Sequence, residues 1–202
     1  FERLFRLCTK NGWTAATGMM ESHYRMHDQI AALINNYYDG KLVSVKPGQQ
    51  KIAFDTLYDH TSGDPVERLL SRSRTLFIQS GYSPTSKRHE EEARKVVAIL
   101  KTIRRRFGAN FTANTVGVVT PWRAQIAQIR NLIDDPEILG KVTIDTIERY
   151  QGSERDIIIV SLAVYHQNQL IPLQSVDLDD TVDRKLLVTV SRAKNQLIML
   201  GF

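Results

Sequence analysis

Two histidines stand four residues apart in the stretch ESHYRMHDQIA, with a tyrosine and an arginine between them. Side chains four residues apart share one face of a helix, so His23 and His27 could begin a zinc site. Tyr24 and Arg25 favour another use, in which the ring stacks on a base and the guanidinium reaches a phosphate. Simple packing is the third interpretation. Neither Cys8 nor the other histidines stand at ligand spacing from the pair, so we expect no metal site and interpret His27 as a helix-start or packing residue.

Two later stretches also interrupt the regular pattern of the chain. In VTIDTIERYQGSERD a Gln-Gly turn and Glu154 separate two apolar runs, and in VSRAKN Arg192 and Lys194 end a helical pattern. An arginine suits phosphoryl transfer because its planar fork is always charged, and one that reaches the γ-phosphate speeds transfer by roughly 10³–10⁵. The simpler alternative for each arginine is a surface ion pair. Glu154 could likewise pair with Arg149 or Arg155, and Lys194 could be a cation that stabilises a helix end.

The bulk composition is that of an ordinary globular domain. The chain has 202 residues, 42% hydrophobic and 24% charged, and one cysteine, which excludes an internal disulfide framework and fits a reducing compartment. The N-terminal residues do not resemble a secretory signal, and the longest apolar run, 156–165, is far shorter than the roughly 20 residues that span a bilayer. We therefore expect an intracellular protein, cytoplasmic or nucleoid-associated, without a membrane partner.

Hydrophobic periodicity predicts alternating strands and helices. Helices are expected at 2–9, 27–40, 86–108, from Pro121 onward with Thr120 as N-cap, and at 182–194; strands are expected at 74–80, 116–119, 141–147, 155–165 and 195–201. Residues 41–72 show no clear period, and we interpret them as an insertion or long excursion. Near-continuous apolar strands that alternate with helices indicate an α/β fold with a parallel sheet covered on both faces.

Positive charge is concentrated in one predicted helix. Residues 87–107 carry eight basic and three acidic side chains, so this segment alone has the net charge of +5 found for the whole chain. Such a charge run favours a polyanionic partner, but runs of this kind on helices are more often solvated faces.

Several nucleotide-binding signatures are absent from the sequence. It contains no G-x-x-x-x-G-K-[ST] phosphate cradle and no G-x-G-x-x-G, and the strand KVTIDT ends in the single acid Asp145 rather than in an Asp-Glu pair suited to Mg²⁺. An α/β chain of this size without its own cradle is either unrelated to nucleotide chemistry or one half of a nucleotide enzyme.

Four blocks, in order, resemble the second RecA-like domain of superfamily-one helicases. They are SHYRMHDQIAALINNYYDGKL, VGVVTPWRAQIAQIRNLI, TIDTIERYQGSERDIIIVSL and LLVTVSRAKNQLIMLG. The resemblance is closest to the group that contains the up-frameshift RNA helicases and the related DNA helicases with a QYRMHP motif. It implies a three-layer RecA-like fold without its own P-loop, with residues 1–202 forming a single C-terminal domain of a larger helicase.

The resemblance also implies roles at a nucleotide site. Tyr24 would stack on or flank the adenine, and Arg25 and Arg192 would both reach the γ-phosphate. A loop that senses the nucleotide would consist of Gln151, Gly152 and Glu154. ATP and Mg²⁺ would be held by an N-terminal RecA-like domain of the same protein, because the phosphate-binding lysine and the Mg²⁺-binding acids belong to that domain in this family.

Single-stranded DNA or RNA is the further partner that the resemblance implies. Thr120 and Thr146 would lie near its backbone, where hydroxyls and helix N-terminal amides bind phosphates, and Trp122 and Arg123 would belong to the same surface. Thr120 could instead serve only as a helix N-cap.

The sequence departs from the family pattern at several places. His23 replaces the family's glutamine, Asp28 its usual proline, Trp122 its tyrosine and Ser191 its frequent threonine. Because of the first of these changes, the resemblance implies no contact for His23, whereas Arg25 and Arg192 match the family pattern. The competing hypothesis is a non-catalytic module for nucleic-acid or protein binding on a RecA-like fold; a helicase–nuclease fusion would involve regions outside these residues.

Overall fold

Five parallel strands form the central sheet. The computed structural model describes residues 2–45, 54–83, 87–150, 152–169, 171, 174–175 and 183–202. The strands run in the spatial order β3 (Thr75–Gln79), β7 (Ala193–Gly201), β6 (Arg155–Ser161), β4 (Val116–Val119), β5 (Thr143–Asp145), and each adjacent pair is parallel. The predicted parallel sheet is therefore confirmed.

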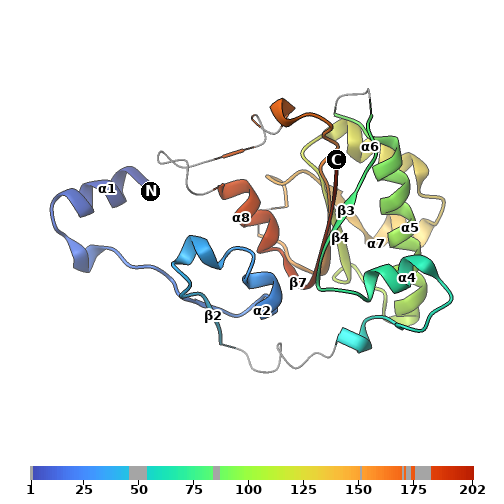
Figure 1. Ribbon diagram of the computed structural model, residues 1–202, viewed down its shortest axis with the longest axis horizontal. Helices are drawn as coiled ribbons and strands as arrows, with labels where there is room; N and C mark the ends of the chain where they lie inside the picture. Colours follow the sequence, from blue (N-terminus) through green and yellow to red (C-terminus); the bar gives the residue numbers. More distant parts are fainter. Residues whose placement is uncertain are drawn as a thin grey trace.

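Helices cover both faces of this sheet (Figure 1). One face carries α4 (Pro65–Leu70), α5 (Glu90–Phe107), α6 (Arg123–Leu132) and α7 (Pro136–Lys141); the other carries α2 (Asp28–Ala31) and α8 (Arg184–Val190). The helix α1 (Glu2–Lys10) lies apart from the sheet, and β1 (Ser22–His23) pairs in parallel with β2 (Val43–Ser44). This arrangement is the three-layer α/β RecA-like fold that the sequence predicts.

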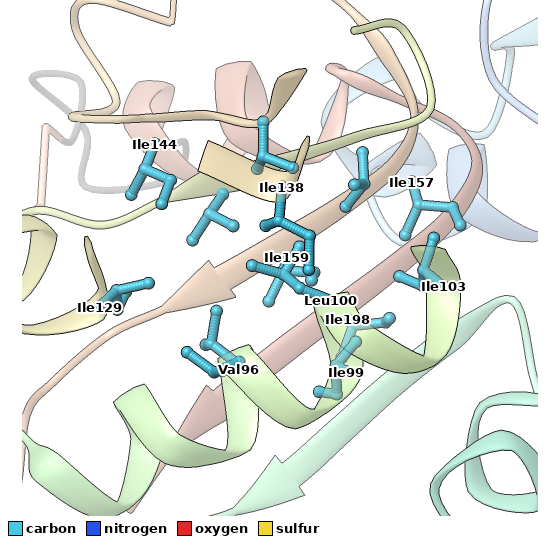
Figure 2. Packing of buried hydrophobic residues seen from close by; sticks show 14 of the residues in the cluster. Val96, Ile99, Leu100, Ile103, Ile129, Ile138, Ile144, Ile157, Ile159 and Ile198 are labelled. Atoms are coloured by element: carbon cyan, nitrogen blue, oxygen red, sulfur yellow. The ribbon is translucent and has the colours of Figure 1, made fainter. Parts of the chain in front are cut away.

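The first core lies between α5 and the sheet (Figure 2). Val96, Leu100 and Ile103 on α5 are completely buried and belong to one cluster with Ile159 of β6 and Ile198 of β7. Burial of an aliphatic side chain of this size contributes roughly 1.5–3 kcal/mol, so this cluster is a main source of stability.

The second core fixes the segment that contains the His-Tyr-Arg motif. Ile30 and Ile34 are completely or almost completely buried in a cluster with Ile158 and Leu197. The backbone N–H of His27 donates to the carbonyl of Lys194 at 2.8 Å. The motif is therefore held against the beginning of β7.

Two predicted helices are shorter in the structure. The helical pattern at 27–40 yields α2, which ends at Ala31, and a separate 3-10 helix, Asn35–Tyr38. The pattern at 182–194 yields α8, which ends at Val190, because β7 starts at Ala193. Pairing with β6 prevails over the helical pattern there: Ala193 pairs with Arg155, whose N–H donates to the carbonyl of Arg192 at 3.1 Å.

Part of the range 41–72 contributes to the core. Leu57, Tyr58 and Leu70 are buried in the cluster beneath α5, and α4 packs on that helix. Residues 46–53 lie outside the described part of the chain. That the range is an insertion stays a prediction.

Candidate nucleotide and nucleic-acid sites

Arg25 and Glu154 come together from distant parts of the chain. Arg25 follows β1, Glu154 directly precedes β6, and their side chains form an ion pair with 2.5 Å between Nε and Oε2. The Nη1 group of Arg25 also donates to the carbonyl of Ser191 at 3.0 Å. Both side chains are partly exposed, at 34% and 40%, so the pair lies at an accessible edge of the domain.

Lys194 completes the pairing of Glu154. Its Nζ lies 2.8 Å from Oε1, the oxygen that Arg25 does not use. The hydrogen bond from Lys194, followed by that from Arg25, lowers the pKa of Glu154 to about 2. The alternative pairing of Glu154 with Arg149 or Arg155 is therefore wrong, and Lys194 is a strand residue with a defined partner rather than a helix-end cation.

Arg192 lies next to this cluster in the turn before β7. Its Nε donates to the carbonyl of Val188 at 3.1 Å, and its Nη1 donates to that of Ser153 at 3.4 Å. Burial, followed by the positive charge of Arg25, lowers the pKa of the Arg192 guanidinium. Within the described chain Glu154 is the only carboxylate ion-paired with Arg25, Lys194 or Arg192, so the cluster carries an excess of positive charge.

The remaining nucleotide candidates flank the cluster. The Tyr24 side chain is 59% exposed, as a ring available for stacking would be. Gly152 is exposed and has a φ of 84°, a left-handed conformation that glycine adopts without strain. Gln151 lies outside the described residues.

The four nucleic-acid candidates lie at the opposite end of the strands. The carboxyl ends of β4 and β5 are followed by these four candidates: Thr120, Trp122, Arg123 and Thr146. By contrast, Glu154 and Arg192 precede β6 and β7. The structure therefore separates the two predicted sites onto opposite edges of one parallel sheet.

Thr120 is used inside the domain. It is completely buried, its N–H donates to the carbonyl of Asp145 at 3.1 Å, and its hydroxyl accepts from the N–H of Trp122 at 3.4 Å. The helix α6 begins at Arg123 with Trp122 as its N-cap residue, so the prediction of a Thr120 cap with Pro121 as first helical residue is wrong.

Trp122, Arg123 and Thr146 reach further towards solvent. The indole N–H of Trp122 donates to the carbonyl of Leu162 at 3.0 Å, and Lys87 Nζ lies 5.5 Å from the centroid of the Trp122 rings. Arg123 is exposed, and Thr146 is partly exposed.

The histidine pair is not placed on one helical face. His23 lies in β1, and His27 is the N-cap of α2, with its Nδ1 accepting from the N–H of Gln29 at 3.2 Å. This confirms that His27 starts a helix. In the part of the chain that the structure describes, no three His, Cys, Asp or Glu side chains gather as a metal site requires.

The basic side chains of the helix α5 form ion pairs. From Arg94 onward every basic side chain of α5 has an acidic partner: Arg94 with Glu90, Lys95 with Glu91, Lys101 with Asp134, Arg104 with Asp135 and Glu137, Arg105 with Asp64, and Arg106 with Glu67. The interpretation as a solvated charged face fits these pairs. None of the helices in the described residues is both long and apolar enough to cross a membrane.

Comparison with known proteins places the chain in a family. A family model described as an AAA domain matches residues 1–202. The chain is 23% identical over 220 residues to the "DNA polymerase alpha-associated DNA helicase A" of Saccharomyces cerevisiae, covering all of this chain and 29% of that protein. It is 27% identical over 188 residues to the "Regulator of nonsense transcripts 1 homolog" of Neurospora crassa, covering 90% of this chain and 16% of that protein.

Among solved structures, the C-terminal domain of a "possible DNA helicase" from Lactobacillus plantarum matches with a TM-score of 0.46 and 15% identity, over 88% of this chain and 86% of that one. The chain spans less than a third of the length of the Saccharomyces cerevisiae relative and of the Neurospora crassa relative. Because the family model covers every residue, the chain belongs to this AAA domain family and is a C-terminal RecA-like domain of the superfamily-one helicase type.

Proposed function

We propose that this chain is the C-terminal motor domain of an ATP-dependent helicase that acts on DNA or RNA. The observation that carries the proposal is the cluster of Arg25, Arg192 and Lys194 around a single ion-paired carboxylate, Glu154. Such an excess of positive charge at a partly exposed edge suits a triphosphate presented by another domain. The relatives whose names include "helicase" support the same activity.

Arg25 and Arg192 fit ATP that is bound elsewhere. The described residues and the sequence contain no phosphate cradle of the P-loop kind, so an N-terminal RecA-like domain of the same protein would hold ATP and Mg²⁺. The bound nucleotide supplies the phosphoryl group that is transferred to water. The two guanidinium groups would stabilise the charge that spreads over the γ-phosphate oxygens, Tyr24 would flank the base, and Glu154, with Gln151 and Gly152, would respond to the nucleotide.

Closure of the two domains on ATP would be the mechanical step. The nucleotide favours the closed state because only there do the arginines meet the phosphates. The opposite edge, with Trp122, Arg123 and Thr146 beside the buried Thr120, would hold the single strand while the domains open and close, so each cycle would advance the strand.

The first prediction is that loss of either arginine lowers ATP turnover without weakening the binding of single-stranded nucleic acid. In the full-length protein, Arg25→Ala and Arg192→Ala should each lower kcat for ATP hydrolysis by about 10³-fold or more. The affinity of each variant for single-stranded DNA or RNA should change little. ATPase and strand-separation assays with DNA and RNA substrates measure both quantities.

Arg72→Ala is the matched control, because Arg72 is exposed and remote in sequence from every candidate site residue. Normal ATP turnover in both arginine variants would refute the assignment and favour a non-catalytic binding module.

A further inference from the structure

Four neighbouring strands are each followed by an aromatic residue at their carboxyl ends. In the spatial order β3, β7, β6, β4, these residues are Tyr82, Phe202, Tyr165 and Trp122. The Tyr82 ring lies 5.3 Å from that of Tyr165 and 6.4 Å from that of Phe202, both in edge-to-face geometry. Tyr82 is 67% exposed. We call these four residues the aromatic row.

A buried polar network ties together the loops that carry the row. At its centre Gln125 accepts from the N–H of His89 at 2.7 Å and donates to Ser161 Oγ at 3.0 Å. Glu92 accepts from Ser161 Oγ at 2.8 Å and from the N–H of Ala163 at 3.0 Å. Since Gln125 follows Trp122, and Ala163 precedes Tyr165, two of the aromatic loops are fixed to each other.

The third loop joins the same network through His89. Its Nε2 lies 2.8 Å from the carbonyl oxygen of Gly81, the residue before Tyr82. Ala163 has a φ of 49°, a left-handed conformation that costs a non-glycine residue free energy and that the bond to Glu92 maintains. The rings are thus presented from a rigid base rather than from free loops.

Cations without acidic partners accompany the row. Lys87 lies over the Trp122 rings, and Arg88 and Arg123 are exposed; in the described part of the chain none of the three forms an ion pair. By contrast, the cations further along α5 are all paired. Aromatic rings that are exposed or partly exposed, combined with positive charge that has no acidic partner, match the two recognisable parts of a single-stranded nucleic acid, its bases and its phosphates.

We infer that the aromatic row is a stacking platform for the unpaired bases of a nucleic-acid strand. The inference rests on the proposed function and adds to it, because it assigns base contacts to Tyr82 and Tyr165, which the family motifs do not include. Stacking is tolerant of sequence, since every base has a π-face, so the platform would grip any single strand.

The test separates base stacking from phosphate binding. Fluorescence anisotropy with the full-length protein compares labelled oligo-dT and oligo-rU with an abasic strand of equal length at one salt concentration. Wild-type protein should bind the base-bearing strands about tenfold or more tightly than the abasic strand. Tyr82→Ala and Tyr165→Ala should each remove about tenfold of this preference and leave abasic affinity unchanged; Tyr82→Phe should behave as wild type.

Trp13→Ala is the control, because Trp13 is an aromatic of similar exposure, 54%, that precedes the 3-10 helix Thr14–Ala16, far from the row in the chain. Equal wild-type affinity for dT and abasic strands, or unchanged dT binding by Tyr82→Ala, would overturn the platform alone. Failure of wild type to bind any of the strands would overturn the proposed function with it. Weaker dT than rU binding would support the platform and identify RNA as the source of the bases.

Discussion

Glu154 forms an ion pair with Arg25, one of the two arginines that the proposed mechanism needs. Its two oxygens are shared between Arg25 and Lys194, so the arginine is oriented before any nucleotide arrives. In the proposed mechanism a γ-phosphate, which carries more negative charge than one carboxylate, would draw Arg25 away, while Lys194 would keep Glu154 ionised and paired. Lys194 is therefore a positioning residue, and its effect should be visible in the titration of Glu154.

The prediction is that Lys194→Met raises the pKa of Glu154 from about 2 towards its ordinary value. An acid with a lowered folded pKa stabilises the fold above its unfolded pKa, near 4.3, and this contribution is lost as pH falls towards 2. As the pH falls from about 4.3 towards 2, the free energy of unfolding of the variant should therefore decrease less than that of the wild type. NMR titration of the Glu154 carboxyl carbon measures the pKa directly.

Lys185→Met is the matched control, because Lys185 pairs with Glu148, 3.2 Å away, and not with Glu154. A pKa of Glu154 that is unchanged by Lys194→Met would contradict the positioning role. Rescue by Lys194→Arg would separate the effect of charge from that of packing.

At the scale of elements, β4 and the loop before β6 depend on one glycine. A Cβ at Gly117 would overlap the hydroxyl of Tyr150 and lie 2.6 Å from its ring carbon Cζ. Tyr150 is 1% exposed and stacks with the guanidinium of Arg155, whose centre lies 5.6 Å from the ring. The glycine thus leaves room for the side chain that supports the residues leading to Glu154.

Gly117→Ala should therefore lower the free energy of unfolding by ~1–3 kcal/mol through overpacking, and should reduce ATP turnover because Glu154 shifts. Urea unfolding measures the stability. Gly140→Ala is the control: an added Cβ there meets no atom within 4 Å, and Gly140 lies inside the helix α7, so its stability should be unchanged or increased. Equal effects of the two substitutions would contradict the packing argument.

The sequence predicted the helices and strands better than the contacts between them. The sheet and the helix α5 follow from hydrophobic periodicity, and Arg25, Glu154 and Arg192 follow from motif resemblance. The end of α8 could not be predicted, because it is set by the Arg155–Ala193 pairing, and neither could the bond from His27 to Lys194 that holds the start of α2. Each of these joins residues far apart in sequence, and local periodicity contains no information about such pairs. The role of Lys194 was missed for the same reason.

At the scale of the whole molecule, the two candidate sites occupy opposite edges of the sheet. β6 extends from Arg155, next to Glu154, to Ser161 in the polar network beneath the aromatic row. At about 3.3 Å per residue this strand is roughly 20 Å long. If the proposed sites bind their ligands, β6 and β7 would act as rigid rods that connect the nucleotide cluster with the proposed nucleic-acid edge, without any direct contact between the two ligands.

This separation leads to a prediction about the domain by itself. The purified 202-residue chain should hydrolyse ATP only at background rate, because its arginines can assist phosphoryl transfer but no sequence motif here cradles the phosphates. It should still bind a single strand, with an affinity that falls as salt rises, because phosphate contacts release counterions. Arg192→Ala should change neither ATP turnover nor strand affinity in the isolated chain, although we expect it to lower kcat by about 10³ or more in the full-length protein. ATP turnover by the isolated chain that depends on Arg192 would show that these residues contain a complete catalytic site, and the division of labour between two domains would have to be abandoned.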